Sequence, residues 1–219
     1  MTYTGEVSPG GPSDQRDLPL LTIRKASVSA MSNNVFLLTC TRTGAQLLID
    51  AAADPARIMS LIGESNGGLD VIVTTHQHWD HHRALRKVVA LTEALTAAGE
   101  ADADALPVIP DRRLVHGNTL AFGDIALDVI HLRGHTPGSV ALAYDDPQGH
   151  THLWTGDSLF PGGPGKTARE EEFTSLMDDL EERVFGRFGD DTWIYPGHGN
   201  DTTLGAERPH VQQWRQRGW

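Results

Sequence analysis

The chain has 219 residues, with 18 lysines and arginines against 29 aspartates and glutamates and a formal net charge of −11 at pH 7. A surface of this sign repels phosphate backbones, so we expect no nucleic-acid partner. The length suits one large domain, and the single cysteine, Cys40, excludes a disulfide within the chain. No run approaches the ~18 apolar residues of a membrane span, and the start lacks an apolar signal segment, so we expect a cytoplasmic protein without a membrane partner.

The chain opens with a polar segment that contains Pro9, Gly10, Gly11 and Pro12. Proline and glycine interrupt regular structure, and the segment has no strand or helix periodicity. We therefore expect a flexible N-terminal arm over residues 1–17 and a single domain over residues 18–219.

Apolar runs rich in β-branched residues alternate with helical patterns along the rest of the chain. The expected strands cover residues 22–29, 35–41, 46–49, 71–74, 125–132, 140–144 and 152–155. The expected helices cover residues 55–62, 83–95 and an amphipathic segment with apolar side chains at helical spacing from Phe173 to Phe188. Strands and helices interleaved in this way predict a layered α/β fold.

The densest cluster of functional side chains directly follows the apolar run at residues 71–73. It contains His76, His78, Asp80 and His81. Imidazole nitrogens and carboxylate oxygens are ligands for zinc, iron(II) and manganese, and residues two apart in an extended segment point to the same side. The cluster therefore predicts a divalent-metal centre at the end of a strand.

Three further candidate ligands follow strand-like runs elsewhere in the chain. They are His135 in a Gly-His-Thr-Pro-Gly segment, Asp157 in Thr-Gly-Asp and His198 in Pro-Gly-His-Gly. Each is weak evidence alone, because single polar residues at turns are common. Four strand ends that each deliver a ligand favour one shared site.

With these motifs the chain resembles the metallo-β-lactamase superfamily, and within it the glyoxalase II-like hydrolases. The resemblance implies an αββα sandwich with two divalent ions at one edge, zinc being the first expectation and iron or manganese the alternatives. It assigns His76, His78 and His135 to the first ion, Asp80, His81 and His198 to the second, and Asp157 to both. Asp80 and Asp157 become the catalytic carboxylates, and Asp50 is expected to orient a metal-bound histidine.

The resemblance also implies the activity, in which a hydroxide bridging the two ions attacks a thioester of a small molecule. Lys166 stands where glyoxalase II places a basic contact to the thiol carrier. Only 21 residues follow His198, so we expect a short form without the helical C-terminal domain that grips glutathione. The thiol is accordingly expected to be another carrier, or glutathione together with another; the oligomeric state is left open.

Other activities of the superfamily remain as alternatives. Lactonases use the same seven ligands and add a tyrosine, for which Tyr195 is the nearest candidate, although it is expected to pack in a strand. Persulfide dioxygenases hold one iron, here through His76, His135 and Asp157. A non-catalytic metal-binding protein ranks lower, and Asp157 disfavours a drug-hydrolysing β-lactamase, which generally lacks a bridging carboxylate.

Overall fold

The computed structural model describes residues 2–65 and 67–218, which fold around two β-sheets. The first sheet has the strand order β1 to β7, and its strands are β1 (Asp14–Asp17), β2 (Leu21–Val28), β3 (Asn33–Cys40), β4 (Gln46–Ile49), β5 (Leu69–Thr74), β6 (Leu95–Gly99) and β7 (Arg112–Leu114). The second sheet has the order β15-β14-β11-β10-β9-β8, with β8 (Thr119–Phe122), β9 (Ile125–His131), β10 (Val140–Asp145), β11 (Thr151–Gly156), β14 (Trp193–Pro196) and β15 (Thr202–Thr203). A separate small hairpin joins β12 (Leu159–Phe160) and β13 (Gly163–Pro164).

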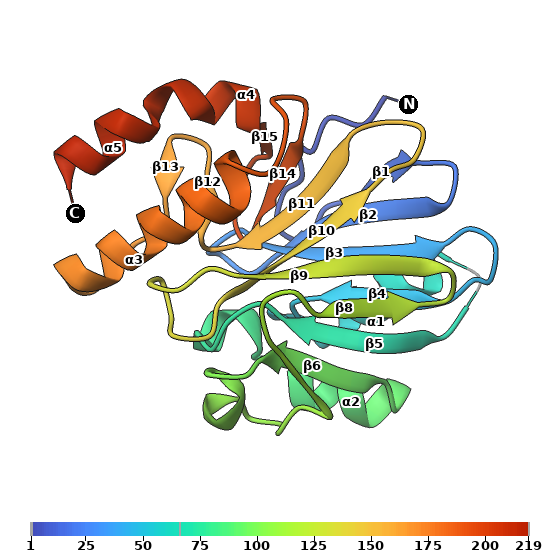
Figure 1. The fold of residues 1–219 in the computed structure, drawn as a ribbon. Coiled ribbons are helices and arrows are strands. Elements are labelled where there is room, and N and C mark those ends of the chain that lie inside the picture. Colours follow the sequence, from blue (N-terminus) through green and yellow to red (C-terminus); the bar gives the residue numbers. More distant parts are fainter. Residues whose placement is uncertain (1, 66, 219) are drawn as a thin grey trace.

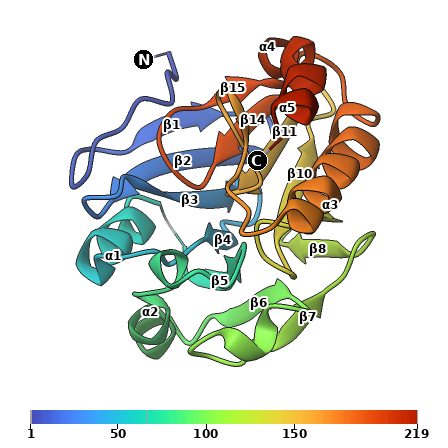
Figure 2. The same ribbon diagram turned by 90° about the vertical axis from the view of Figure 1, so that its left-hand side faces the viewer.

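Helices cover the outer face of each sheet (Figures 1 and 2). The first sheet is covered by α1 (Pro55–Gly63) and α2 (Leu85–Thr92), and the second by α3 (Glu170–Leu180), α4 (Leu204–Glu207) and α5 (Val211–Arg217). The amphipathic segment predicted from Phe173 onward corresponds to α3 and a π-helical turn, Glu181–Phe185. The four layers are helix, sheet, sheet and helix, which confirms the predicted αββα sandwich.

Strand β3 shows how a buried strand serves two cores. All eight of its residues are buried. Phe36 and Leu38 face the space between the sheets, whereas Val35 and Leu37 pack with α1 and α2. Because successive side chains of a strand point to opposite faces, a sheet covered on both sides needs a continuous apolar run rather than an alternating one.

The structure corrects the predicted helix over residues 83–95. The helix α2 ends at Thr92, and Glu93 adopts a left-handed conformation with φ 55°. Leu95 instead begins β6, which pairs in parallel with β5. The short strands β7 and β8 had no clear sequence signal, because an edge strand of three or four residues has too few positions to display a period.

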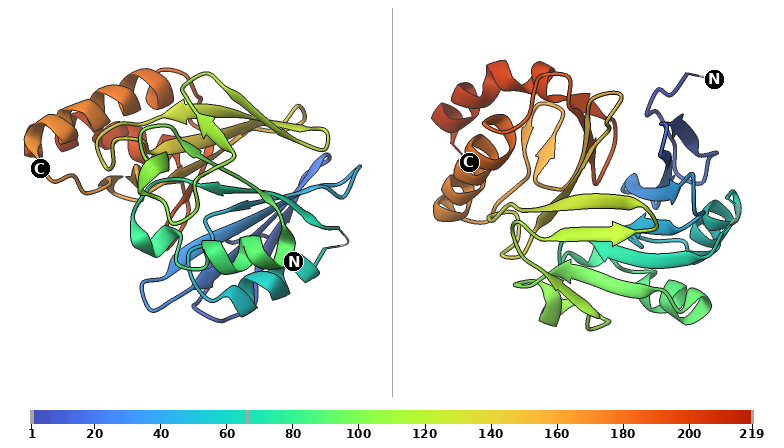
Figure 3. Two further views of the ribbon diagram at one scale, coloured as in Figure 1. Left: turned by 90° about the horizontal axis from the view of Figure 1, so that it is seen from below. Right: turned by 45° about the vertical axis from the view of Figure 1, so that its right-hand side comes forward.

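The predicted N-terminal arm makes specific contacts over its described part. Strand β1 pairs with β2, and the Tyr3 hydroxyl donates a hydrogen bond of 2.6 Å to Asp201. Tyr3 also packs against the core between the sheets. The flexibility of this arm stays a prediction. Figure 3 shows the two ends of the chain lying apart, with α5 beside α3. Within the described residues no helix is long and apolar enough to cross a membrane.

Candidate metal centre

All the candidate ligands follow the carboxyl ends of strands. His76, His78, Asp80 and His81 come after β5, His135 after β9, Asp157 directly after β11, and His198 after β14. The parallel pairing of β11 with β14 brings the last two loops to one edge of the second sheet. Strands that end at the same edge gather side chains that are more than 100 residues apart in sequence, so the predicted shared site is present as a cluster.

The seven side chains form three overlapping groups, in each of which the potential ligand atoms lie within 4.8 Å of one another. The groups are His76, His78 and His135; His76, His81 and Asp157; and Asp80, His81 and His198. The middle group shares one histidine with each outer group and adds Asp157. This arrangement fits a dinuclear divalent metal site.

Four of the histidines are oriented by contacts at Nδ1, the ring nitrogen that would not bind the metal. The Nδ1 atoms of His81, His135 and His198 donate to Asp50 Oδ2 at 2.8 Å, the Lys166 carbonyl at 2.7 Å and the Met31 carbonyl at 2.9 Å. Nδ1 of His76 lies 3.0 Å from the Thr75 hydroxyl oxygen. In a neutral ring whose Nδ1 carries the proton, Nε2 has the lone pair, so these four Nε2 atoms are free to bind a metal.

The Nε2 atoms have contacts that hydrogen bonding alone does not satisfy. Nε2 of His76 and of His135 and Oδ1 of Asp157 are buried without a hydrogen-bond partner among the described residues. Nε2 of His81 and Nε2 of His198 lie 3.1 Å apart, so at most one of these two atoms can carry a proton. Buried polar atoms are normally paired, and a cation between these atoms satisfies them.

The pKa values of His76 and His81 are shifted in opposite directions. Burial among neighbouring imidazoles lowers the pKa of His76 well below its usual value. Burial would also lower the pKa of His81, but the carboxylates of Asp50 and Asp157 raise it to about 10. His76 is therefore neutral and ready to bind at neutral pH, whereas His81 must release a proton when a metal binds.

Asp50 is the predicted orienting carboxylate, and the structure places it beside His81. Its side chain is buried and accepts hydrogen bonds from the Thr75 amide at 2.7 Å and the Thr75 hydroxyl at 2.8 Å in addition to that of His81. Three donors hold the carboxylate between β4 and the loop that carries His76. Asp50 thus couples the positions of His76 and His81.

Two residues that sequence reasoning missed hold other parts of the centre. Asn33 donates to Asp80 Oδ2 at 2.9 Å, and Asp102 accepts from the amides of Gln77 and Gly138 and from the Thr136 hydroxyl. Asp102 is fully buried and ties the loop after β5 to the loop after β9. Neither residue belongs to a motif, and the alanine-rich stretch at residues 101–105 contains both Asp102 and the exposed Asp104, so the sequence does not single out the buried one.

Lys25 binds the loop that carries His198. Its buried ammonium donates to the Gly199 carbonyl, the Gly5 carbonyl and Asp201 Oδ1 at 2.7, 2.8 and 2.7 Å. A buried lysine with three acceptors fixes all three segments at once. The contact to Gly199 is one residue from His198.

Lys166 lies beside the centre, where its backbone carbonyl binds His135. Its side chain is exposed and lines a cavity of about 200 Å³ with His78, His135, Thr167 and Ala168. Trp79, between the ligands, is 57% exposed and lies under the guanidinium of Arg83 at 4.5 Å. His82 is outside the clusters, with Nε2 3.0 Å from the Gln77 carbonyl.

The family follows from a comparison with models of known families. Residues 28–199, which include the whole candidate centre, match the model described as the metallo-beta-lactamase superfamily. The chain belongs to the metallo-β-lactamase superfamily. The match includes both sheets' ligand-bearing loops, so the residues that carry the resemblance are those that form the cluster.

Two curated relatives and one solved structure indicate which members of the superfamily the chain is similar to. The chain is 37% identical over 134 residues to a hydroxyacylglutathione hydrolase of Jannaschia sp. (strain CCS1), which covers 61% of this chain and 50% of that protein. It is 27% identical over 209 residues to the hydroxyacylglutathione hydrolase GloC of Haemophilus influenzae, covering 86% and 95%. The crystal structure of TTHA1623 in a di-iron-bound form superposes with a TM-score of 0.68 at 30% identity, covering 84% and 96%.

These similarities confirm the predicted resemblance to glyoxalase II-like members of the superfamily. The chain spans half the length of the Jannaschia protein.

Proposed function

We propose that this superfamily member is a metal-dependent hydrolase that cleaves a thioester. The observation that carries the proposal is the chain of three overlapping ligand groups, with Asp157 in the middle group. In this proposal His76, His78 and His135 hold one ion, Asp80, His81 and His198 hold the other, and Asp157 contacts both. Two ions engage the whole cluster, whereas a single iron held by His76, His135 and Asp157 would leave the group of Asp80, His81 and His198 without an ion.

Divalent ions held there would lower the pKa of a water molecule and polarise a carbonyl oxygen, whatever the metal. The chain's own residues supply the orientation. Asp50, Lys166 and Met31 each accept a hydrogen bond from one histidine and orient its opposite ring nitrogen toward the centre. Zinc is our first expectation for the ions, and iron or manganese would fit the same donors.

The thioester assignment rests on similarity and on Lys166. Several relatives are named hydroxyacylglutathione hydrolases, which places a thioester of glutathione among the substrates to test first. The cavity that Lys166 lines opens beside His78 and His135, so an ammonium there could contact the thiol half of a bound thioester. Glutathione or another low-mass thiol would fit this role.

Lactone hydrolysis is a weaker second candidate. A lactonase would need a tyrosine at the carbonyl, and Tyr195 is fully buried between the sheets. Its hydroxyl bonds to His152 at 2.9 Å, and its ring stacks on Trp154. Tyr195 therefore packs in the strand and does not reach the ligand cluster.

The test is a turnover assay on a panel of thioesters and lactones, with metal content measured on the same sample. We expect two ions per chain and thioester turnover that disappears on chelation. A His78→Ala variant should lose metal and turnover, whereas His82→Ala, its matched control outside the cluster, should keep both. A single iron per chain with oxygen consumption, or metal without turnover of any substrate, would contradict the proposal.

A further inference from the structure

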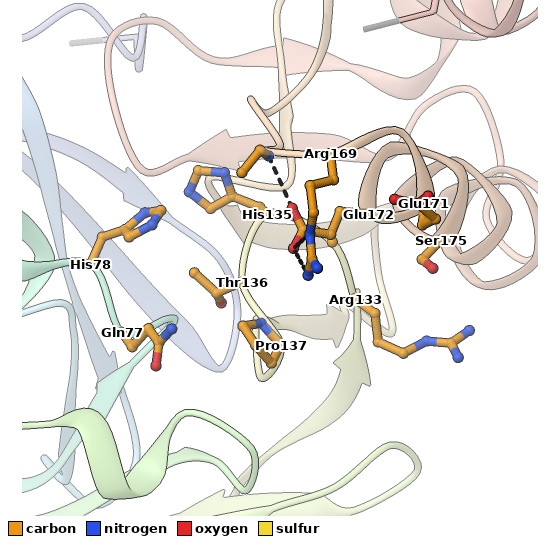
Figure 4. A pocket seen from close by; sticks show the side chains of 12 residues that line it. Gln77, His78, Arg133, His135, Thr136, Pro137, Arg169, Glu171, Glu172 and Ser175 are labelled. Atoms are coloured by element: carbon orange, nitrogen blue, oxygen red, sulfur yellow. Dashed lines mark hydrogen bonds and ion pairs between the residues drawn. The ribbon is translucent and has the colours of Figure 1, made fainter.

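A cleft of about 550 Å³ opens beside His78 and His135 (Figure 4). One wall comes from the loops after β5 and β9, with Gln77, Thr136 and Pro137. The other wall comes from the segment that enters α3. The cleft is separate from the cavity lined by Lys166 but shares His78, His135 and Ala168 with it, so both lead away from the same ligands.

The first wall is rigid. Asp102 binds the Gln77 amide and the Thr136 hydroxyl, at 2.9 and 2.5 Å. Gly134 adopts φ 129°, and a Cβ there would lie 2.2 Å from the Glu172 carbonyl oxygen, so the loop after β9 approaches α3 closely. A rigid wall offers its polar groups at fixed positions.

Arg133 contributes a guanidinium whose orientation is fixed. Its Nε and Nη2 donate to the two carboxylate oxygens of Asp179 at 2.9 and 2.6 Å. The Asp179 side chain is fully buried and also lies 3.4 Å from Arg183. The Arg133 side chain is 50% exposed, and its Nη1 takes no part in the two bonds to Asp179. Figure 4 shows this side chain extending away from His135 along the cleft.

On the opposite wall, Arg169 is likewise held by a carboxylate. Its Nε and Nη2 donate to Glu172 Oε1 at 3.0 and 2.5 Å, while 72% of its side chain is exposed. Figure 4 shows the guanidinium between His135 and Glu172, pointing toward Pro137. Glu172 is itself held, because its Oε2 accepts from the Ala168 amide at 3.0 Å.

Guanidinium groups held in fixed positions favour a carboxylate ligand. Each arginine is already balanced by an acid, so the cleft selects through directed N–H donors rather than through net charge. A planar guanidinium held in place forms charge-assisted hydrogen bonds to a carboxylate at a small entropic cost. The neutral polar side chains of Gln77 and Ser175 along the cleft favour a polar group over a hydrocarbon chain.

We infer that this cleft binds a carboxylate group of the substrate, with Arg133 and Arg169 as its hydrogen-bond donors. The inference rests on the proposed thioester hydrolysis and names a feature of its substrate. The carboxylate could belong to the acyl half or to the thiol half, because both cavities start at the same ligands.

The experiment uses pairs of substrates that differ only by carboxylate and carboxamide. In the acyl arm, the adipoyl and adipamoyl thioesters of N-acetylcysteamine are compared. In the thiol arm, the S-acetyl derivatives of 3-mercaptopropionate and 3-mercaptopropionamide are compared. Each pair is measured on the full metal-loaded chain and on Arg133→Met, Arg169→Met and the control Arg187→Met, whose surface ion pair with Asp128 lies outside the cleft.

We expect kcat/KM to favour the carboxylate by about 10- to 100-fold in one arm, mainly through KM, and expect this preference to shrink at least fivefold in Arg133→Met or Arg169→Met. Arg187→Met should keep it. The arm that shows the preference identifies the half of the substrate that carries the carboxylate. Metal content should be equal in all variants.

Equal rates for carboxylate and carboxamide in both arms, or a preference that survives both cleft variants, would overturn the inference even with good turnover. Absence of turnover for every thioester would instead count against the proposed function. In that case binding of the matching thioethers, which cannot be hydrolysed, decides the inference: carboxylate preference that depends on the two arginines supports it, and equal binding overturns it.

Discussion

Oδ2 of Asp50 accepts a hydrogen bond of 2.8 Å from Nδ1 of His81, and both side chains are buried. The two residues are 31 positions apart and belong to different strand ends. The bond fixes the ring so that Nε2 faces Asp80, Asp157 and His198.

Replacing Asp50 by asparagine should weaken metal binding without unfolding the chain. Asn tolerates the positive φ of 59° at this position, but it is a poorer acceptor for His81 and for Thr75. We expect metal affinity to fall by about 10- to 100-fold, measured by competition with a chelator. Asp54→Asn, at another positive-φ aspartate, is the control; unchanged affinity in Asp50→Asn would contradict the orienting role.

Asp157→Ala tests the residue common to both proposed ions. Without its carboxylate, the middle ligand group loses its only acidic member. We expect hydrolysis to disappear and metal content to fall below two ions per chain, measured by elemental analysis. The exposed Asp124→Ala should behave like the parent, and an Asp157→Ala variant with two ions and full activity would contradict the ligand assignment.

Lys166→Ala should separate substrate binding from metal binding. The contact to His135 is made by the backbone carbonyl of Lys166, so truncating the side chain leaves that hydrogen bond in place. We expect retained metal content and a KM for thioesters raised by about tenfold, as for a lost hydrogen bond to a charged group. Lys87→Ala, at another exposed lysine, is the matched control. An unchanged kcat/KM in Lys166→Ala would show that the Lys166 side chain does not bind the substrate.

Lys25→Met should destabilise the chain and loosen the loop of His198. The substitution leaves the buried carboxylate of Asp201 without its cation, although Tyr3 and Trp193 still donate to it. We expect the free energy of unfolding to fall by about 3 kcal/mol, measured by denaturant titration. The double variant Lys25→Met with Asp201→Asn should recover part of the lost stability, because it removes the unpaired charge. A Lys25→Met variant as stable as the parent would contradict the role of Lys25 in joining these segments.

His152 should make stability depend on pH. Burial lowers the pKa of His152 to about 3, so the folded chain keeps this ring neutral while the unfolded chain protonates it below its ordinary pKa of ~6.5. A lowered histidine pKa means that stability is complete above pH ~6.5 and is lost as the pH falls toward 3. Between pH 7.5 and 5.0 the contribution is about 2 kcal/mol.

The measurement compares unfolding of the parent and His152→Gln at both pH values in the same metal state. We expect the variant to lose about 2 kcal/mol less than the parent over this interval. The exposed His210→Gln should lose as much as the parent. Equal pH dependence in the parent and His152→Gln would show that this ring is not protonated on unfolding.

The sequence by itself determined the identity of the clustered side chains and the order of most elements. The ligand motifs are short and follow strands whose apolar runs are unambiguous, so His76, Asp157 and His198 could be recognised before their positions were known. The interleaved strand and helix patterns predicted a layered α/β fold, and the resemblance to the superfamily implied its αββα arrangement.

Only the tertiary structure decided which residues support that cluster. Asn33, Asp102 and Lys25 act through contacts to segments 20 to 176 residues away, and no local pattern encodes such pairings. The end of α2 at Thr92 was decided by the pairing of Leu95 in β6, which overrides a local helical preference. The arginine-lined cleft likewise exists only because the close approach of α3 to Gly134 places Arg133 and Arg169 around one cavity. Packing and long-range hydrogen bonds form between folded surfaces, so their partners are set by the three-dimensional arrangement rather than by neighbouring sequence.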